Sequence, residues 1–393
     1  MKLELPGKTT ADDITGLANV SVAMLQKIRD SMLEPFPRKK TPLLSSSRVQ
    51  EICGIDRQRM NYALKKGDLP QGQQSRPGAP RSFSIEETIQ WVRTEAKPVP
   101  RKGKAKVITV ANFKGGVTKT TTTMGLGQGL TMRRGRKVCH VDLDPQGSLT
   151  TLFGINPHAE IDPSQTVYAL VEAYSEKTEF DMRSLPQQTY WPNLDLIPSS
   201  TDLFNAEFML PARARIDGPS AAFEKVLSDG FEQLKDEYDY IIVDTPPTLS
   251  YLTINAIYAA DSVIIPVVPD VLSLASMVQF FQLFSDLVNG MRSVGLDEHH
   301  KDFDFLDILI TRMVQEDSPK VVRDWVQQVY GSRVLPIEIP ETVVARNANL
   351  RFSTVYDLAS TDVNAESLRR IRPAFDQLVD RIDDKFCALW QRG

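Results

Sequence analysis

The residues best suited to chemistry lie in segment 112–121, Asn-Phe-Lys-Gly-Gly-Val-Thr-Lys-Thr-Thr. The segment follows the β-branched apolar run 107–111 and opens a helical stretch, so two glycines and a lysine stand between a strand and a helix. In such a loop the glycines let backbone N–H groups approach phosphate oxygens. Lys119 would then supply a cation to the β/γ-phosphates of a nucleotide, and the hydroxyl of Thr120 would bind Mg²⁺.

The loop departs from the common pattern G-x-x-x-x-G-K-[ST] at two positions. Phe113 and Thr118 stand where that pattern has glycine, and a second lysine, Lys114, precedes Lys119. A lysine at the loop entrance cannot easily reach back to its own nucleotide, but it can reach a nucleotide bound by a facing subunit. The sequence therefore predicts a homodimer.

Two further segments place carboxylates directly after apolar strands. Residues 138–148 read Val-Cys-His-Val-Asp-Leu-Asp-Pro-Gln-Gly-Ser, and residues 240–247 read Tyr-Ile-Ile-Val-Asp-Thr-Pro-Pro. Asp142 and Asp144 are two residues apart, so both can emerge near a γ-phosphate, and Asp244 ends the other strand. Carboxylates in these places suit a Mg²⁺ ion and a positioned water in phosphoryl transfer. A single aspartate at a strand end would more often be a helix N-cap or a loop hydrogen bond.

These three motifs, in this order, resemble the motifs of the ParA/MinD ATPase family. Lys-Gly-Gly-Val-x-Lys-Thr-Thr resembles its deviant P-loop, and the two later segments resemble its first switch and its Walker B strand with the second switch. Thr120 suits Mg²⁺ as a direct ligand, and Asp244 suits it through a water. The resemblance implies that Asp144 orients the attacking water and that Asp142 lies nearer the metal. It also implies that Lys114 acts in trans on the partner subunit's phosphates.

The expected site residues come from the three motifs and from one weaker resemblance, to a segment on the adenine side of the nucleotide. Residues 267–270, Val-Val-Pro-Asp, resemble the family's adenine-side segment, although a proline at a strand exit often only ends the strand. The expected cofactors are ATP and Mg²⁺. The expected catalytic residues are Lys114, Lys119 and Asp144; the nucleotide-binding residues are Lys114, Gly115, Gly116, Val117, Thr118, Lys119, Thr120, Thr121, Pro269 and Asp270; the metal ligands are Thr120, Asp142 and Asp244.

Apolar strands alternate with helical stretches around these motifs. The alternation predicts an α/β fold with a mostly parallel twisted sheet, helices on both faces and the nucleotide at the carboxyl ends of the strands. The predicted strands are 107–111, 138–142, 194–197, 240–244, 263–268 and 306–311. The predicted helices include 119–132, 220–235, 252–259, 273–290, 320–330 and 364–390. We divide the chain into an N-terminal helix (1–37, a candidate for dimerisation), a winged helix-turn-helix domain (38–95), a charged linker (96–106) and a P-loop ATPase domain (107–393).

Charge is distributed unevenly between the front of the chain and the rest. The net charge is −4, but residues 1–106 carry +9 and the remaining residues carry −13. A basic N-terminal region followed by an acidic remainder suggests that the N-terminal region binds a polyanion.

The basic region contains a helix-turn-helix pattern. Helices over 45–53 and 57–66 flank a Gly-Ile-Asp turn, and the loop 71–80 resembles a wing. The exposed side of the second helix could hydrogen-bond base edges and phosphates. The alternative is a helical hairpin with an ordinary solvated basic face. The predicted DNA-binding residues here are Arg57, Arg59, Asn61, Lys65 and Lys66.

The C-terminal part of the sequence offers one further DNA candidate and one amphipathic helix. Residues 340–351 resemble the segment after the last core strand in partition ATPases, where surface arginines bind DNA without sequence preference. Arg346 and Arg351 match that segment only roughly, and solvated arginines are an equal alternative. The helix 364–390 carries aspartates among its arginines, so packing on the core is favoured over a membrane-bound helix, whose polar face would be basic.

Composition indicates the cellular compartment that the sequence suits. No apolar run is long enough to span a membrane, and no N-terminal signal peptide is evident. Three cysteines lie far apart in the sequence, which fits a reducing cytoplasm better than a disulfide framework.

The resemblance covers about residues 105–355 and implies a ParA-type DNA-segregation ATPase. Such a protein would form an ATP-dependent dimer that binds nonspecific DNA, would be stimulated by a centromere-binding partner of ParB type and would be cytoplasmic and nucleoid-associated. The N-terminal extension implies an autorepressor that binds an operator. The alternatives are a MinD-like regulator at the membrane, a metabolic P-loop enzyme and a DNA-binding repressor without turnover.

Overall fold

The computed structural model describes residues 9–32, 39–217, 222–293, 301–341, 353–358 and 365–392. The chain separates into two units, residues 1–40 and residues 41–393. Among its described residues, the first unit has the helix α1 (Ala11–Met32), as expected for an N-terminal helix. Ile14, Leu17, Val20 and Met24 of this helix are exposed within the chain.

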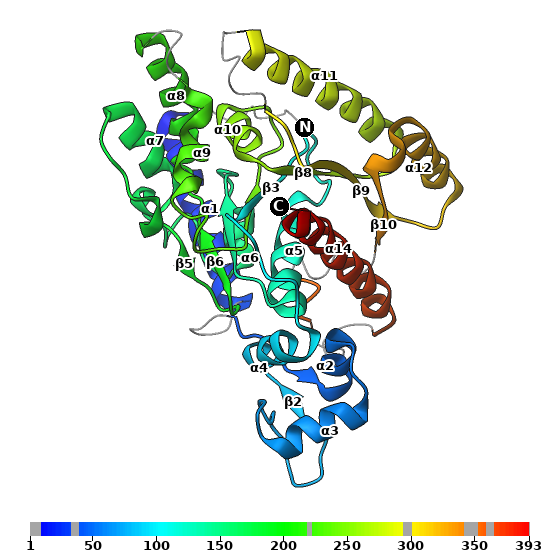
Figure 1. The fold of residues 1–393 in the computed structure, drawn as a ribbon. Coiled ribbons are helices and arrows are strands. Elements are labelled where there is room, and N and C mark those ends of the chain that lie inside the picture. Colours follow the sequence, from blue (N-terminus) through cyan, green and yellow to red (C-terminus); the bar gives the residue numbers. More distant parts are fainter. Residues whose placement is uncertain are drawn as a thin grey trace, which may run out of the picture. The chain divides into compact units, whose positions relative to one another are not determined.

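The second unit contains all other elements (Figure 1). Its helices are α2 (Ser46–Cys53), α3 (Arg57–Lys66), α4 (Ile85–Trp91), α5 (Lys119–Arg134), α6 (Ser148–Leu152), α7 (Val167–Glu176), α8 (Leu203–Asp217), α9 (Val226–Glu232), α10 (Tyr251–Ala259), α11 (Val271–Ser293), α12 (Asp317–Tyr330) and α14 (Ala365–Arg392). Its strands are β1 (Leu44–Ser45), β2 (Ser82–Phe83), β3 (Lys106–Val110), β4 (Val138–Asp142), β5 (Gln187–Gln188), β6 (Leu194–Ile197), β7 (Tyr240–Asp244), β8 (Ser262–Val267), β9 (Phe305–Met313) and β10 (Val334–Pro340).

The main sheet has eight strands in the order β10-β9-β8-β3-β7-β4-β6-β5. All neighbouring pairs are parallel except β5 with β6, which is antiparallel. The mostly parallel sheet confirms the predicted fold class. Since parallel strands end at one edge, the loops after β3, β4, β7, β8 and β9 meet there.

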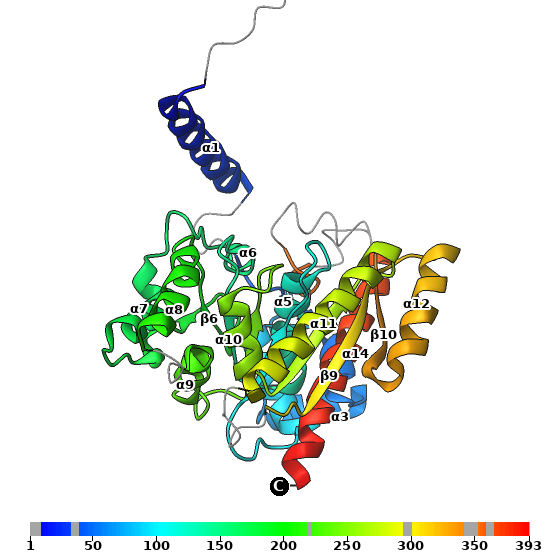
Figure 2. The same cartoon turned by 90° about the horizontal axis from the view of Figure 1, so that it is seen from above.

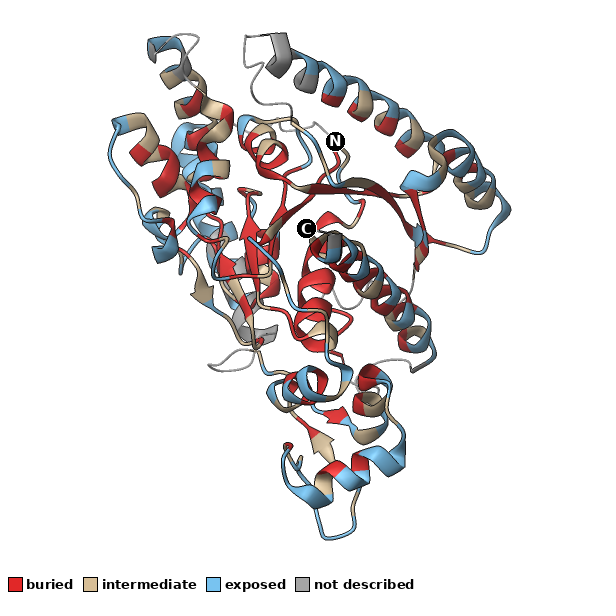
Figure 3. Cartoon of the chain, in the orientation of Figure 1, coloured by how far each residue is buried: buried red, intermediate tan, exposed pale blue. Residues whose placement is uncertain are grey.

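Helices cover both faces of the sheet, as predicted (Figure 2). Side chains alternate along the central strand, so Ile108 and Val110 of β3 pack in one core with α5 and α14, whereas Val107 belongs to a second core with α7 to α10. A third core joins β8 and β9 to α11. Figure 3 shows the buried strands between the two helical layers.

Helix α5 packs unusually close to α14 because it carries glycines on that side. A Cβ atom at Gly125 would lie 2.5 Å from the ring of Phe375, and one at Gly129 would lie 2.3 Å from Val379. Both distances are too short for a real contact, so only glycine allows this approach. The helix that begins at the phosphate loop is thereby fixed against the C-terminal helix.

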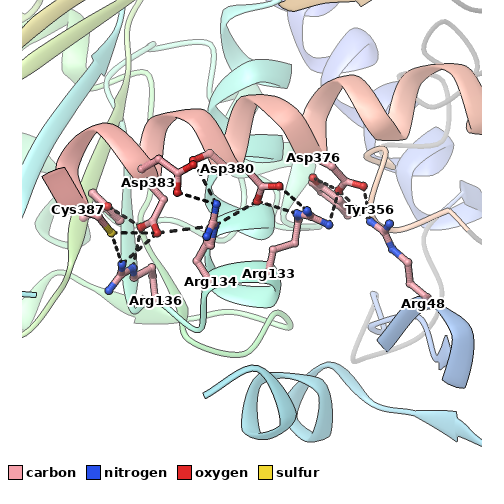
Figure 4. A network of polar contacts seen from close by, with 11 residues as sticks. Arg48, Arg133, Arg134, Arg136, Tyr356, Asp376, Asp380, Asp383 and Cys387 are labelled. Carbon is pink, nitrogen blue, oxygen red and sulfur yellow. Dashed lines mark hydrogen bonds and ion pairs between the residues drawn. The ribbon is translucent and has the colours of Figure 1, made fainter. Parts of the chain in front are cut away.

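The acidic residues of α14 form ion pairs with the end of α5 (Figure 4). Asp383 is 1% exposed and accepts hydrogen bonds from Arg136 Nε (2.7 Å) and Tyr240 Oη (2.8 Å). Asp376, also buried, accepts from both Arg48 of α2 and Tyr356. Packing of α14 on the core is confirmed, and several of its aspartates pair with arginines of the chain rather than forming a separate solvated face.

The two helices predicted over 45–53 and 57–66 are present as α2 and α3. Asp56 accepts a hydrogen bond from Arg59 N (2.7 Å) at the start of α3, and Gly54 ends α2 in the left-handed conformation (φ 65°). β1 and β2 pair antiparallel, and Gln73 bridges to Ser82. This region shares one hydrophobic core with α5 and α14.

Residues 97–105, within the predicted linker, lie against the rest of the unit. Arg101 donates to the backbone carbonyls of Lys235, Asp236 and Tyr238. Arg136 donates to the carbonyl of Val99 (2.8 Å). The segment is therefore a fixed connection. Separately, none of the described helices is long and apolar enough to cross a membrane.

Candidate functional site

The phosphate loop connects β3 to α5 and leaves its glycines exposed at the carboxyl edge of the sheet. Gly116 has φ 73°, and Thr118, the residue before the helix, has φ 67° and ψ 28°. The loop amides and the positive end of the α5 dipole together form a place for phosphate. The predicted loop between a strand and a helix is present, and the binding of phosphate by its residues stays a prediction.

Lys119 stands at the first position of α5 and is only 7% exposed. Its ammonium donates to the carbonyl of Lys114 (3.2 Å). Burial lowers the pKa of Lys119, while the nearby charges of Asp244 and Asp144 act in the opposite direction. An ammonium held in this way gains strongly from an incoming phosphate, which would compensate its lost hydration.

Asp244 lies at the end of β7, opposite Asp142 at the end of β4. Its Oδ1 accepts from Thr123 Oγ1 (3.3 Å), and Oδ2 has no hydrogen-bond partner among the residues that the structure describes. Burial raises the pKa of Asp244 to about 7, although the nearby Thr120 hydroxyl and the charge of Lys119 lower it. A buried carboxylate oxygen without a partner favours binding of a cation.

The Thr120 hydroxyl and the Asp244 carboxylate fit Mg²⁺, which prefers a few protein oxygens together with phosphate and water. Thr120 and Asp244 would hold the ion at the end of the phosphate loop. Within the described ranges there is no cluster of three or more His, Cys, Asp or Glu residues that could form a metal cage. Mg²⁺ at the predicted site would take part of its coordination from the nucleotide and from water.

The Asp142 carboxylate accepts hydrogen bonds from the loop and the helix that follow β4. Its Oδ2 accepts from Thr150 N (2.8 Å) and Thr150 Oγ1 (2.7 Å), and its Oδ1 accepts from Asp144 N (3.2 Å). Burial and the neighbouring Asp244 raise the pKa of Asp142 well above its usual range. These contacts fix the loop after β4 at the nucleotide edge, and the role of Asp142 as a metal ligand stays a prediction.

Asp144 is partly exposed at the same edge. Its Oδ1 accepts from Gln146 N (3.0 Å), and its carbonyl accepts from Ser199 Oγ (2.6 Å). Its charge acts on both Lys119 and Asp244. The structure thus brings together the predicted catalytic carboxylate, the phosphate-binding lysine and the predicted metal ligand.

Lys114 and Asp270, both predicted at the nucleotide, contact each other. Lys114 Nζ donates to Ser273 Oγ (2.7 Å) and to Asp270 Oδ1 (3.2 Å). Asp270 also accepts from Ser273 N (2.7 Å) in the first turn of α11. Burial opposes the ionised form of Asp270, but the hydrogen bonds from Ser273 and Lys114 lower its pKa overall. Lys114 must leave this pair to act on a facing subunit, and the adenine-side roles of Pro269 and Asp270 remain predictions.

The predicted DNA-binding residues of α3 divide into two groups. Arg57, Asn61 and Lys65 are exposed along one side of the helix. Arg59 instead forms a bidentate ion pair with Glu95 (2.8 Å for both hydrogen bonds), and Lys66 pairs with Asp68. Sequence reasoning did not foresee these two pairs. Arg346 and Arg351 lie outside the described residues.

Comparison with known proteins supports the motif assignment. A family described as an AAA domain matches residues 105–294. Sporulation initiation inhibitor protein Soj of Bacillus subtilis (strain 168) is 34% identical over 241 residues, which cover 61% of this chain and 85% of Soj. A putative replication protein A of Rhizobium rhizogenes is 29% identical over 390 residues, which cover 95% of this chain and 94% of that protein.

Solved structures show the same fold. A partition protein that is 19% identical has a TM-score of 0.61 and covers 86% of this chain and 96% of its own. Cobyrinic acid a,c-diamide synthase from Mycobacterium smegmatis, solved with an ATP analogue and magnesium, is 28% identical with a TM-score of 0.53 and covers 70% of this chain and 93% of its own. With its phosphate loop, its two carboxylate strands and its similarity to Soj, the chain belongs to the ParA-type family of partition ATPases.

Proposed function

We propose that the protein is a cytoplasmic, nucleoid-associated DNA-segregation ATPase that hydrolyses ATP to ADP and phosphate. The observation that carries the proposal is the meeting of Lys119, Asp144 and Asp244 at one edge of the sheet. Asp244 ends β7 beside Asp142, whose carboxylate accepts from Asp144 N (3.2 Å), and Lys119 begins the helix that follows the neighbouring strand β3. The solved synthase with an ATP analogue and magnesium supports ATP and Mg²⁺ as the ligands of such a loop.

Each residue has a role that follows from its place. The loop amides and Lys119 would neutralise the β/γ-phosphates, while Asp144 would orient a water in line with the γ-phosphate. Bound Mg²⁺, held by Thr120 and Asp244, would neutralise charge on the phosphate oxygens. Lys114 of a facing subunit would add a further cation to the same phosphates.

We further propose two DNA-binding activities and a protein partner. An ATP-dependent homodimer would bind nonspecific DNA, and a centromere-binding partner of ParB type would stimulate hydrolysis and release it. The α2–α3 region would bind an operator and repress transcription. Support for the latter comes from the exposed residues Arg57, Asn61 and Lys65 on α3 and from the +9 balance of residues 1–106.

The proposed reaction can be tested by measuring ATP hydrolysis with the purified chain alone, with random duplex DNA and with DNA plus the partner. We expect weak turnover alone and a rise with each addition, all dependent on Mg²⁺. Turnover that is insensitive to both DNA and partner would contradict the proposed function.

Replacing Lys114 with alanine should spare ATP binding by the monomer but weaken the ATP-dependent dimer and its turnover. The reason is that Lys114 lies at the loop entrance, with its ammonium on Asp270 and Ser273. Dimer formation is measured by analytical ultracentrifugation and hydrolysis by phosphate release. Arg183→Ala, which removes an exposed cation paired with Asp181, is the matched control. A Lys114 variant that dimerises and hydrolyses ATP normally would show that Lys114 is only a surface charge.

The two DNA activities should separate when Arg57, Asn61 and Lys65 are all replaced by alanine. Base-edge contacts contribute discrimination of about 1–3 kcal/mol each, so operator preference should disappear. Nonspecific ATP-dependent binding should survive with its steep salt dependence, because we assign it to the ATPase body, with Arg346 and Arg351 as candidates. Affinities for operator and random duplexes across a salt series measure both activities. Equal loss of both would mean that one surface serves both.

A further inference from the structure

The phosphate loop contains a residue in an unfavourable backbone conformation. Thr118 is β-branched yet has φ 67° and ψ 28°, in the left-handed region where the common P-loop pattern places glycine. A β-branched residue is a true outlier there, and such strain persists only when the surrounding structure enforces it. Contacts from other parts of the chain must therefore hold the loop in this conformation.

Two consecutive residues at the end of β9 contact the carbonyls just before Thr118. Thr311 is fully buried, and its Oγ1 donates to the carbonyl of Val117 (3.2 Å) and to that of Val267, the last residue of β8 (3.4 Å). Arg312 Nη1 donates to the carbonyl of Gly116 (3.4 Å). The loop is thus tied to β9 across the end of β8.

The second of these residues is itself strained and is held from its other side. Arg312 has φ 53°, and its Nη2 donates to Glu341 Oε1 (2.9 Å) directly after β10. Its guanidinium therefore bridges the phosphate loop and the end of β10. Two of the five non-glycine residues described with positive φ, Thr118 and Arg312, therefore lie near each other, because the Arg312 guanidinium contacts the carbonyl two residues before Thr118.

We propose that Thr311 and Arg312 are positioning residues that stabilise the nucleotide-binding shape of the phosphate loop and compensate for the missing glycine at position 118. They act through the carbonyls of Gly116 and Val117, whose fixed orientation keeps Thr118 left-handed. Without these two contacts, part of the binding free energy of ATP would be needed to return Thr118 to the left-handed conformation. The proposal rests on the proposed function in taking ATP as the ligand of this loop.

A double-mutant cycle between positions 312 and 118 tests this coupling in the full-length chain. Arg312→Asn removes the guanidinium but keeps a residue that tolerates the left-handed region, and Thr118→Gly removes the strain. We expect Arg312→Asn to raise the Kd for MgATP about tenfold in the Thr118 chain and less than about twofold in the Thr118→Gly chain. Turnover at saturating ATP should stay within about twofold, because the lost contact weakens the bound ground state and the transition state equally.

A second pair of variants tests the hydrogen bond from the buried Thr311 hydroxyl to the carbonyl of Val117. Thr311→Val removes the hydroxyl with little change of shape, whereas Thr311→Ser keeps it. Thr311→Val should repeat the behaviour of Arg312→Asn, including rescue by Thr118→Gly, and Thr311→Ser should resemble the wild type. Arg183→Asn, at an exposed ion pair with Asp181, is the control for loss of a guanidinium.

Hydrogen exchange of the nucleotide-free chain separates this proposal from the proposed function. Arg312→Asn should speed amide exchange over residues 112–121 with threonine at 118 but much less with glycine there. If the wild type bound no ATP while this exchange pattern appeared, the proposed function would fail and the positioning role would stand. An equal loss of ATP affinity in both backgrounds, or no loss in either, would overturn the positioning role.

Discussion

Replacing Lys119 with alanine is expected to abolish ATP binding, with a loss of affinity of at least about a hundredfold. Lys119 is 7% exposed at the start of α5, where its ammonium donates to the carbonyl of Lys114 and no ion pair compensates its burial within the described part of the chain. The β/γ-phosphates would therefore lose their main cation. Titration of the full-length chain with a fluorescent ATP analogue in the presence of Mg²⁺ measures the effect.

Because Lys119 is buried, Lys119→Ala should lose ATP binding without a large loss of folding stability. Because burial already lowers the pKa of Lys119, its charged form is costly in the nucleotide-free protein. Removing it should change the free energy of unfolding by no more than about 1 kcal/mol. Thermal unfolding without nucleotide provides the check, and Lys104→Ala, at an exposed pair with Glu232, serves as the control. Normal ATP affinity in a folded Lys119→Ala variant would remove the P-loop assignment.

Replacing Asp144 with alanine should stop turnover while leaving ATP and Mg²⁺ binding intact. Asp144 is close enough for its charge to act on Lys119 and Asp244, yet it is partly exposed, as a residue that orients water must be. Removing a water-positioning group usually costs about 10²–10⁴-fold in rate. The variant should therefore accumulate as an ATP-bound dimer on DNA.

Single-turnover hydrolysis and DNA retention in the same samples measure this prediction. Asp181→Ala, which removes an exposed carboxylate, should behave as the wild type. Wild-type turnover in Asp144→Ala would count against a catalytic role. Loss of ATP binding together with turnover would instead indicate that the carboxylate only shapes the loop.

Much of the fold follows from local patterns in the sequence. The strands Val138–Asp142, Leu194–Ile197 and Tyr240–Asp244 match their predictions residue for residue, since buried parallel strands are short and mostly apolar. β10 was missed, and its sequence Val-Leu-Pro-Ile-Glu-Ile-Pro contains two prolines and a charge. Such residues are tolerated at a sheet edge, which is where β10 lies.

Contacts between distant segments could not be predicted in this way. Lys114 meets Asp270, and Arg136 meets Asp383, only because the topology brings their helices and loops together. The aspartates of α14 suggested a non-membrane helix, but nothing in their spacing identifies arginines of α5 as their partners. Thr118 stood out as a departure from the P-loop pattern, yet the contacts of Thr311 and Arg312 that accompany it are visible only in three dimensions.

The most direct test of the proposed function is retention of random duplex DNA by the full-length protein without nucleotide, with ADP and with ATP plus Mg²⁺. We expect strong retention only with ATP and Mg²⁺, falling steeply as salt is raised because phosphate contacts dominate nonspecific binding. Lys119→Ala should remove this retention, and Asp144→Ala should prolong it. Equal retention in all three nucleotide conditions, or none in any, would contradict an ATP-dependent DNA-segregation protein.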